Sequence, residues 1–101
     1  MNESPQCFED ACRQAALALA EMVINKQRDY GHSNINAFGE LGILVRVNDK
    51  VERLKNLILN KKDAVTEPKD DAWDDIGGYS IIEKMRRHGW FNLELKQGGK
   101  T

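Results

Sequence analysis

Apolar residues recur along the N-terminal third of the chain at steps of three and four, which places their side chains on one face of an α-helix. The stripe consists of Phe8, Cys12, Ala15, Leu19 and Met22, with Lys26 at its end. Ser4 followed by Pro5 is typical of a helix start, with serine as the N-cap and proline at the first helical position. Gly31 is a residue type that ends helices in the left-handed conformation. The pattern predicts a helix from Ser4 to about Tyr30.

A second apolar stripe predicts a long helix from near Asn36 to about Leu59. Its members alternate at three and four residues: Leu44, Val47, Val51, Leu54 and Ile58, with Phe38 and Leu41 extending the stripe backwards. The Asn and Ser side chains between His32 and Asn36 compete with the backbone for hydrogen bonds, so a loop is predicted there. Gly39 and Gly42 weaken the helix start, and such glycines favour the close approach of another backbone or of a ligand.

A third helix is predicted to begin around Pro68, because acidic residues crowd its first turn, where the helix dipole favours negative charge. Basic residues followed by Gly89 are typical of its end. Trp90 and Phe91 are then expected to fold back onto the helices. The pair Gly77-Gly78 lies inside this helix and lacks the strand-to-helix context of a phosphate loop, so tight helix packing explains it better.

These elements predict an all-α fold, a small antiparallel bundle of three main helices with a short C-terminal segment. A chain of 101 residues is expected to form one domain over residues 1–94, followed by a flexible polar tail at 95–101. Trp73 and Tyr79 are expected in the core or at an interface. Because so small a domain buries only part of its apolar surface, association with a second copy is expected to complete the bundle.

Composition excludes some classes of partner. With 41% hydrophobic residues, 31% charged residues and a net charge of −1, the chain has no overall basic field for nucleic acid or membranes. Its basic residues are interleaved with acids, so no nucleic-acid partner is expected. No apolar run approaches the ~20 residues of a membrane span and no basic segment leads into one, so a cytoplasmic location is expected. Cys7 and Cys12 fall on different faces of the predicted helix, which predicts reduced thiols.

Local charge is uneven although the total is near zero. Between Arg46 and Lys62 there are six Lys or Arg against two acids, and between Asp63 and Asp75 six acids against one Lys. Acidic side chains at helical spacing repel one another unless something neutralises them, and a divalent cation would do so. If the two segments lie side by side, carboxylates and cations converge, which is the chemistry needed to hold a metal-bound phosphate.

The predicted third helix offers several pairs of metal ligands. Asp71 and Asp75 are one helical turn apart, and Asp74 lies three residues after Asp71, so any of these pairs can chelate one ion. Asp70 and Asp71 also suit a helix start, where a solvated acidic turn is common. Both interpretations remain open from charge alone.

The long second helix carries charged residues that admit two interpretations. Asp49 and Glu52 are three residues apart and can complete a metal site by facing the third helix, or form ion pairs within their own helix with Lys50 and Arg53. Arg46, Lys50 and Arg53 fall at i, i+4 and i+7. They can grip successive phosphates of a nucleotide or form a solvated edge beside the core stripe.

The end of the predicted first helix places a cation and an aromatic ring close together. Lys26 and Tyr30 can reach a bound base or phosphate from there, with Asp29 between them. A tyrosine in this position is also common as a packing residue with its hydroxyl in water. His32 and His88 have no partner at a metal-binding spacing, so neither is assigned a role.

Three ordered blocks of the sequence resemble the nucleotide modification associated domain 1 family. The blocks are Lys26-x-x-Asp29-Tyr30-Gly31, then Phe38-Gly39-Glu40-x-Gly42-Ile43 leading into Arg46-x-x-Asp49-Lys50-x-x-Arg53-Leu54-x-x-Leu57, then Asp71-x-Trp73-x-Asp75-Ile76-x-Gly78-Tyr79. The resemblance covers about residues 22–88. That family occurs largely in phages and bacteria, and it is similar in logic to the all-helical MazG-like nucleoside triphosphate pyrophosphohydrolases.

The resemblance implies an all-α fold in which carboxylates of two neighbouring helices hold Mg²⁺, or Mn²⁺ in its place, and in which homodimers or homotetramers build the site. The resemblance implies that Asp49, Asp71 and Asp75 are metal ligands, and Glu52 is a further candidate for that role. It implies that Arg46, Lys50 and Arg53 contact the phosphates. Lys26 and Tyr30 would lie near the nucleotide. MazG-like enzymes typically carry Glu-x-x-Glu where this sequence has Asp49-x-x-Glu52, which makes the metal site poorer.

The expected function is therefore Mg²⁺-dependent attack of water on the α-phosphate of a nucleoside triphosphate, with release of pyrophosphate. A carboxylate such as Asp74 or Glu52 is expected to accept the proton of that water. The alternative is a catalytically silent helical module that binds a nucleotide or a protein, such as a phage accessory protein. The reduced set of carboxylates favours that alternative.

Overall fold

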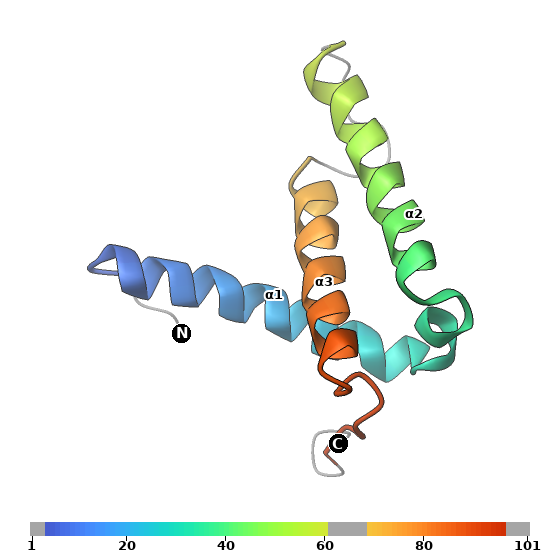
Figure 1. The fold of residues 1–101 in the computed structure, drawn as a ribbon. Coiled ribbons are helices and arrows are strands. Elements are labelled where there is room, and N and C mark those ends of the chain that lie inside the picture. The colour runs from blue at the N-terminus through green and yellow to red at the C-terminus, as the bar shows by residue number, and fades with distance from the viewer. Residues whose placement is uncertain (1–3, 61–68, 97–101) are drawn as a thin grey trace.

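The computed structural model describes residues 4–60 and 69–96, which form three helices and no strand: α1 (Phe8–Tyr30), α2 (Ser33–Ile58) and α3 (Lys69–Arg87) (Figure 1). The predicted all-α fold is confirmed. α2 and α3 run antiparallel, whereas α1 crosses α3, which packs against both other helices (Figure 1). None of the helices in these ranges is long and apolar enough to cross a membrane. The predicted start of the third helix at Pro68 lies outside the described residues, and so does most of the predicted tail.

The start of α1 differs from the prediction, whereas its end agrees with it. The helix begins at Phe8 and not at Ser4, and Glu9 and Asp10 occupy its first turn. Negative charge there is favoured by the helix dipole, so the acidic pair marks the start although Ser4 is the better N-cap residue type. At the other end, Gly31 has a φ of 69° and its N–H donates to the carbonyl of Gln27 at 2.9 Å. The predicted glycine stop is confirmed.

The predicted loop between His32 and Asn36 is wrong, because α2 already begins at Ser33. The break in the chain comes later, at Gly39, whose φ of 60° and ψ of −146° interrupt the helical geometry of α2. Residues other than glycine rarely adopt this conformation. A Cβ at this position would also lie 3.3 Å from Nη2 of Arg86. The first turns of α2 therefore run in a different direction from the rest of the helix (Figure 1).

The hydrophobic core is small and includes the segment after α3. Ile35, Ile43 and Phe91 form a buried cluster. Partly buried side chains pack around it: Val47, Tyr79, Ile82 and Met85. Phe91 is 6% exposed, so it folds back as predicted, whereas Trp90 is 49% exposed. Trp73 is 57% exposed and does not belong to the core of a single copy.

Only one side of the predicted α2 stripe is covered. Leu54 is 5% exposed and Val47 is half-buried, whereas Leu44, Val51 and Ile58 are exposed. The expectation that the whole stripe lies in the core is wrong for a single copy, because α3 covers only part of the width of the stripe.

Two consecutive glycines let α1 approach α3 closely. A Cβ on Gly77 would lie 2.7 Å from Cδ1 of Leu19, and one on Gly78 would lie 2.8 Å from Cε of Met22. Real Cβ atoms are not found at such distances from other carbon atoms. The predicted role of this glycine pair in tight helix packing is confirmed.

Candidate functional site

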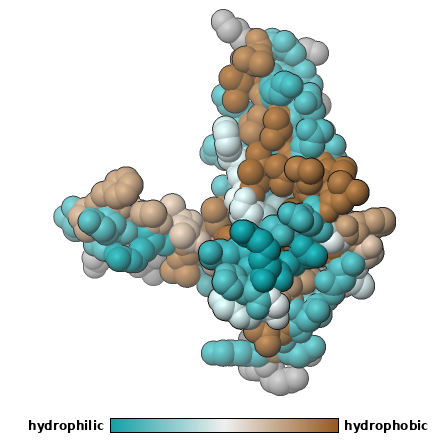
Figure 2. Space-filling model, viewed as in Figure 1, coloured by the Kyte–Doolittle hydropathy of each residue, from teal (hydrophilic) through white to brown (hydrophobic). Residues whose placement is uncertain are grey.

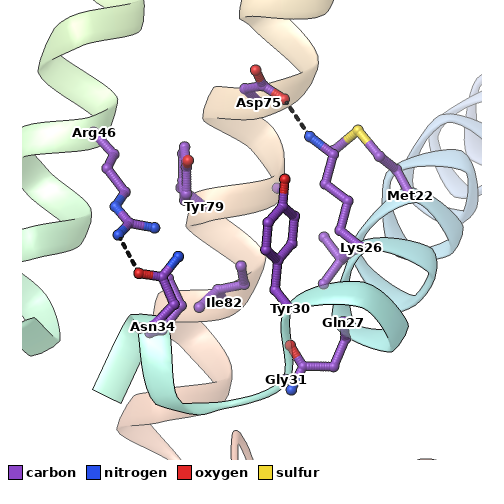
Figure 3. A pocket seen from close by; sticks show the side chains of 13 residues that line it. Met22, Lys26, Gln27, Tyr30, Gly31, Asn34, Arg46, Asp75, Tyr79 and Ile82 are labelled. Carbon is purple, nitrogen blue, oxygen red and sulfur yellow. Dashed lines mark hydrogen bonds and ion pairs between the residues drawn. The ribbon is translucent and has the colours of Figure 1, made fainter. Parts of the chain in front are cut away.

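A cavity of about 210 Å³ lies where the end of α1, the beginning of α2 and the middle of α3 meet (Figure 3). Its polar and aromatic lining consists of Lys26, Gln27, Tyr30, Asn34, Arg46, Asp75 and Tyr79, and its apolar lining includes Met22, Val23, Ile35 and Ile82. Lys26, Tyr30, Arg46 and Asp75 were predicted as site residues from three separate parts of the sequence, with Lys26 and Tyr30 together at the end of the first helix. The fold brings these four side chains to one cavity.

Asp75 stands at the centre of the charged part of the site. Its Oδ1 accepts a hydrogen bond from Nζ of Lys26 at 3.1 Å, and its Oδ2 lies 2.9 Å from Nζ of Lys50. The Asp75 side chain is 15% exposed. Burial raises the pKa of this carboxyl, but the hydrogen bonds and positive charges of Lys50 and Lys26 together outweigh burial and hold the pKa below its ordinary value. Asp75 is therefore an anion tied to both neighbouring helices.

Arg46 is oriented by a residue that precedes the kink in its own helix. Its Nη2 donates to Oδ1 of Asn34 at 2.9 Å (Figure 3). Because Gly39 redirects α2 between the two residues, Asn34 faces Arg46 across the cavity instead of lying three turns away along a straight helix. Sequence reasoning assigned Asn34 to a loop and missed this contact. In the sequence, Gly39 was the only indication that the helix could bend and bring these two residues together.

Two tyrosines stand beside the cavity, one from α1 and one from α3 (Figure 3). Tyr79, which was predicted in the core or at an interface, is partly buried and packs against the core cluster. Tyr30 is 66% exposed, so its ring can contact a ligand without displacing core residues. The turn next to Tyr30 is held by a 2.7 Å hydrogen bond between Nε2 of Gln27 and Nδ1 of His32, which the sequence did not predict.

A second cavity of about 240 Å³ adjoins the first and is acidic. It is lined by Asp71, Asp74 and Asp75 of α3 together with Met22 and Lys26 of α1. Met22, Lys26 and Asp75 line both cavities. The three predicted carboxylates of α3 therefore share one hollow with a lysine, next to the site of Arg46 and the tyrosines.

The acidic residues of α2 that were predicted as metal ligands lie outside both cavities. Asp49 and Glu52 are exposed and line neither cavity, and Glu52 forms an ion pair with Lys55 at 3.2 Å. Arg53 is half-buried and also lies outside the lining of both cavities. Within residues 4–60 and 69–96 no three His, Cys, Asp or Glu side chains form a group that could hold a metal ion. A metal ion shared by the carboxylates of α2 and α3 stays a prediction.

Comparison of the sequence with protein-family models found no match, and comparisons with curated proteins and with solved structures found none either.

Proposed function

We propose that this chain binds a nucleoside phosphate in the cavity between the three helices. The observation that carries the proposal is the convergence of Lys26 and Tyr30 of α1 with Arg46 of α2 on this cavity. The same residues belong to the sequence blocks that resemble the nucleotide modification associated domain 1 family. A cavity of about 210 Å³ is smaller than the roughly 300–1,000 Å³ of a typical ligand pocket, so part of a nucleotide would extend into solvent.

The charges of the site suit a phosphate group. Of the residues that line this cavity, Lys26 and Arg46 carry two positive charges against the single negative charge of Asp75, which Lys50 also neutralises. The further carboxylates, Asp71 and Asp74, line the adjoining hollow. A guanidinium has five N–H donors in a planar fork, and the bond to Asn34 fixes the direction of that fork. The exposed ring of Tyr30 offers a face on which a base can stack.

The binding test is isothermal titration calorimetry with nucleoside mono-, di- and triphosphates, performed once in buffer with Mg²⁺ and once in buffer with EDTA. Arg46→Gln is expected to lower the affinity roughly 10- to 100-fold, because a hydrogen-bonded charge is lost. Lys26→Met is expected to act in the same direction. The matched controls are Arg28→Gln, an exposed α1 residue outside the cavity, and Lys55→Met, whose side chain is 54% exposed, as is that of Lys26. Equal losses in control and cavity variants would exclude the site.

The reaction that we propose for a bound nucleoside triphosphate is Mg²⁺-dependent hydrolysis to a monophosphate and pyrophosphate. Asp71 and Asp75 would hold the ion, with water and phosphate oxygens as further ligands, since Mg²⁺ is often bound by one or two carboxylates. The ion would supply charge neutralisation and a more acidic water. Asp74 lines the same hollow and would accept the proton of the water that attacks the α-phosphorus. The bond from the α-phosphorus to the bridging oxygen breaks, and pyrophosphate leaves.

Pyrophosphate release from a panel of nucleotides with Mg²⁺ or Mn²⁺ tests this reaction. Asp71→Asn and Asp74→Asn are expected to lower release at least tenfold, because general-base catalysis alone contributes roughly 10²–10⁴-fold. Asp70→Asn is the matched control, because this aspartate is on the same helix but does not line the acidic cavity. Background-level release from the wild type would remove the hydrolase proposal and leave the binding proposal intact.

One observation favours the alternative of a catalytically silent nucleotide-binding module. Each oxygen of Asp75 already contacts a lysine ammonium group, so a metal ion there would share a carboxylate oxygen with a positive charge that repels it. Nucleotide affinity that is unchanged by EDTA, together with no turnover, would establish the silent module. Affinity that depends strictly on Mg²⁺ would support the hydrolase.

A further inference from the structure

The first turns of α2, residues 33–38, line one side of the nucleotide cavity through Asn34 and Ile35. The kink at Gly39 separates them from the rest of the helix and leaves roughly one and a half turns, a length that is marginal in water without packing partners. In this described part of the chain, His32 at the N-cap makes no side-chain cap bond and the first turn has no acidic residue. The direction of these turns therefore depends on contacts with other segments.

The segment after α3 supplies two such contacts. Phe91 packs with Ile35 in the buried cluster, and its ring meets the ring of His32 edge-on, with the ring centroids 5.5 Å apart. Nδ2 of Asn36 donates a hydrogen bond to Oδ1 of Asn92 at 2.7 Å. His32, Ile35 and Asn36 fall at i, i+3 and i+4, so they share one face of the helix. The segment after α3 thus holds one face of the first turns of α2.

This segment is itself anchored to the end of α3 by its backbone. The N–H of Trp90 donates to the carbonyl of Met85 at 2.9 Å, and the N–H of Leu93 donates to the carbonyl of Trp90 at 3.2 Å. Figure 2 shows hydrophilic surface where α3 ends, and the buried Phe91 turns away from this surface into the core. Phe91 and Asn92 therefore connect the end of α3 to the first turns of α2.

The opposite face of these turns reaches the nucleotide cavity. Asn34 is two residues from both His32 and Asn36, which places it about 200° around the helix from each of them. Its Oδ1 accepts the hydrogen bond that orients Arg46, with 2.9 Å to Nη2. A shift or rotation of the first turns of α2 would therefore move the acceptor away from the guanidinium.

We propose that Asn92, together with Phe91, positions the first turns of α2 so that Asn34 holds the guanidinium of Arg46 ready for a phosphate group. Neither Asn92 nor Phe91 lines the cavity, so both act without touching the ligand. The inference rests on the proposed nucleotide binding. It adds a positioning residue 46 places further along the chain than Arg46, on a segment outside the site.

Isothermal titration calorimetry with nucleoside mono-, di- and triphosphates tests the role of Asn92. Asn92→Ala removes the acceptor and is expected to lower nucleotide affinity roughly 2- to 10-fold, the range that one neutral hydrogen bond supports. Asn56→Ala is the matched control, because Oδ1 of Asn56 accepts a bond of similar length, 2.8 Å, from Nδ2 of Asn60 at the far end of α2. Its affinity is expected to equal that of the wild type. Equal affinities of Asn92→Ala and a binding wild type would overturn the proposal.

Two aspartate variants separate the hydrogen bond from the charge. Asn92→Asp keeps the acceptor oxygen and is expected to bind within about twofold of the wild type. Asn36→Asp adds the same charge to the same pair but removes the donor, so two oxygens face each other, and a loss at least as large as that of Asn92→Ala is expected. Equal losses in Asn92→Asp and Asn36→Asp would overturn the proposal. Circular dichroism verifies that all variants are helical.

The Nε–H signal of Arg46 in the ¹H–¹⁵N NMR spectrum of the nucleotide-free protein tests the positioning role without a ligand. This signal is expected to shift in Asn92→Ala, and to stay at its wild-type position in Asn92→Asp and in Asn56→Ala. A wild type that binds no nucleotide would refute the proposed function, whereas the spectrum would still decide whether Asn92 controls Arg46. An Arg46 signal that does not respond to Asn92→Ala would overturn the positioning role, whether or not nucleotides bind.

Discussion

Lys26 and Asp75 are 49 positions apart in the chain, yet Nζ of the lysine lies 3.1 Å from Oδ1 of the aspartate. The other oxygen of the same carboxylate lies 2.9 Å from Nζ of Lys50. One side chain of α3 thus ties α1 and α2 together at the edge of the proposed nucleotide site. The same contacts that hold the three helices in place also set the charge of the cavity.

Asp75→Asn is expected to destabilise the protein by about 1–2 kcal/mol, because it removes the charge that two ammonium groups share. This loss of stability lies between the losses expected for an exposed and for a buried ion pair, since Asp75 is 15% exposed whereas Lys26 is 54% exposed. Urea unfolding followed by circular dichroism measures the change. Asp74→Asn, one residue earlier and exposed, is expected to stay within about 0.5 kcal/mol of the wild type. Equal stabilities of the two variants would contradict the role given to Asp75.

The ion pairs of Asp75 also predict how stability depends on pH. The pKa of this carboxyl is lower in the folded protein than in the unfolded chain, because the two lysines outweigh the effect of burial. Its contribution is therefore fully present above the unfolded pKa of about 4 and is lost as the pH falls through the lower, folded pKa. The stability difference between wild type and Asp75→Asn is expected to be constant from about pH 5 to 8 and to shrink below about pH 4. A difference that grows on acidification would contradict this assignment.

Much of the fold follows from patterns that are local in the sequence. The apolar spacing of α1 and its glycine stop at Gly31, the acidic first turn of α3 and the packing role of Gly77-Gly78 were all predicted and are present. The first three features depend on residues within one or two helical turns, and the glycine pair was recognised from its residue type inside a predicted helix, although the contacts it makes are with α1. Helix periodicity and helix caps describe interactions over that range.

The predictions from sequence fail where a contact between distant residues, or a single backbone dihedral angle, determines the structure. The long second helix was predicted without a kink, and the left-handed φ of Gly39, which redirects its first turns, cannot be derived from apolar spacing. The α2 stripe was predicted to be core, but periodicity gives the direction of a stripe and not the width that a neighbouring helix covers. Leu44 and Val51 are exposed for that reason.

The candidate site was predicted in part. Charge and helical spacing pointed to Arg46 and Asp75, and the end of the first predicted helix to Lys26 and Tyr30; all four line one cavity, and Asp71 and Asp74 line the acidic cavity beside it. Spacing did not predict that Asp75 would be held by two lysines, because that contact joins three helices. It also did not predict Asn34, whose position depends on the kink.

Gly77→Ala tests the packing between α1 and α3. Alanine improves helix propensity by about 1 kcal/mol. Its Cβ, however, would lie 2.7 Å from Cδ1 of Leu19, and the other atoms at the branched end of the Leu19 side chain lie close to the same point. Overpacking of this kind costs about 1–3 kcal/mol, so a net loss of about 1 kcal/mol is expected in urea unfolding.

Gly78→Ala is the matched comparison for this packing. Its Cβ would meet Cε of Met22, the far end of a flexible side chain that can move aside. Its stability is therefore expected within about 0.5 kcal/mol of the wild type, since the gain in helix propensity offsets the remaining crowding. A Gly77→Ala protein as stable as Gly78→Ala would show that Leu19 does not limit the approach of the helices.

Gly39→Ala tests whether the kink in α2 builds the nucleotide site. The φ of 60° and ψ of −146° at this position belong to a region that only glycine occupies readily, so about 1–3 kcal/mol of stability is expected to be lost. If the chain relieves the strain by straightening α2, Asn34 moves away from Arg46 and the guanidinium loses its orientation. Titration calorimetry is then expected to show nucleotide affinity roughly tenfold lower than that of the wild type.

Gly89→Ala separates this effect from backbone strain alone. Gly89 also has a left-handed φ, 75°, but it follows the end of α3 and does not line the nucleotide cavity. Its replacement is expected to lower stability by about 1 kcal/mol and to leave nucleotide affinity unchanged. Both substitutions introduce backbone strain where a glycine has a left-handed φ, but only residue 39 lies between Asn34 and Arg46. A loss of affinity confined to Gly39→Ala would therefore assign the effect to the kink. An equal loss in both variants would mean that general destabilisation, and not the direction of the first turns of α2, controls binding.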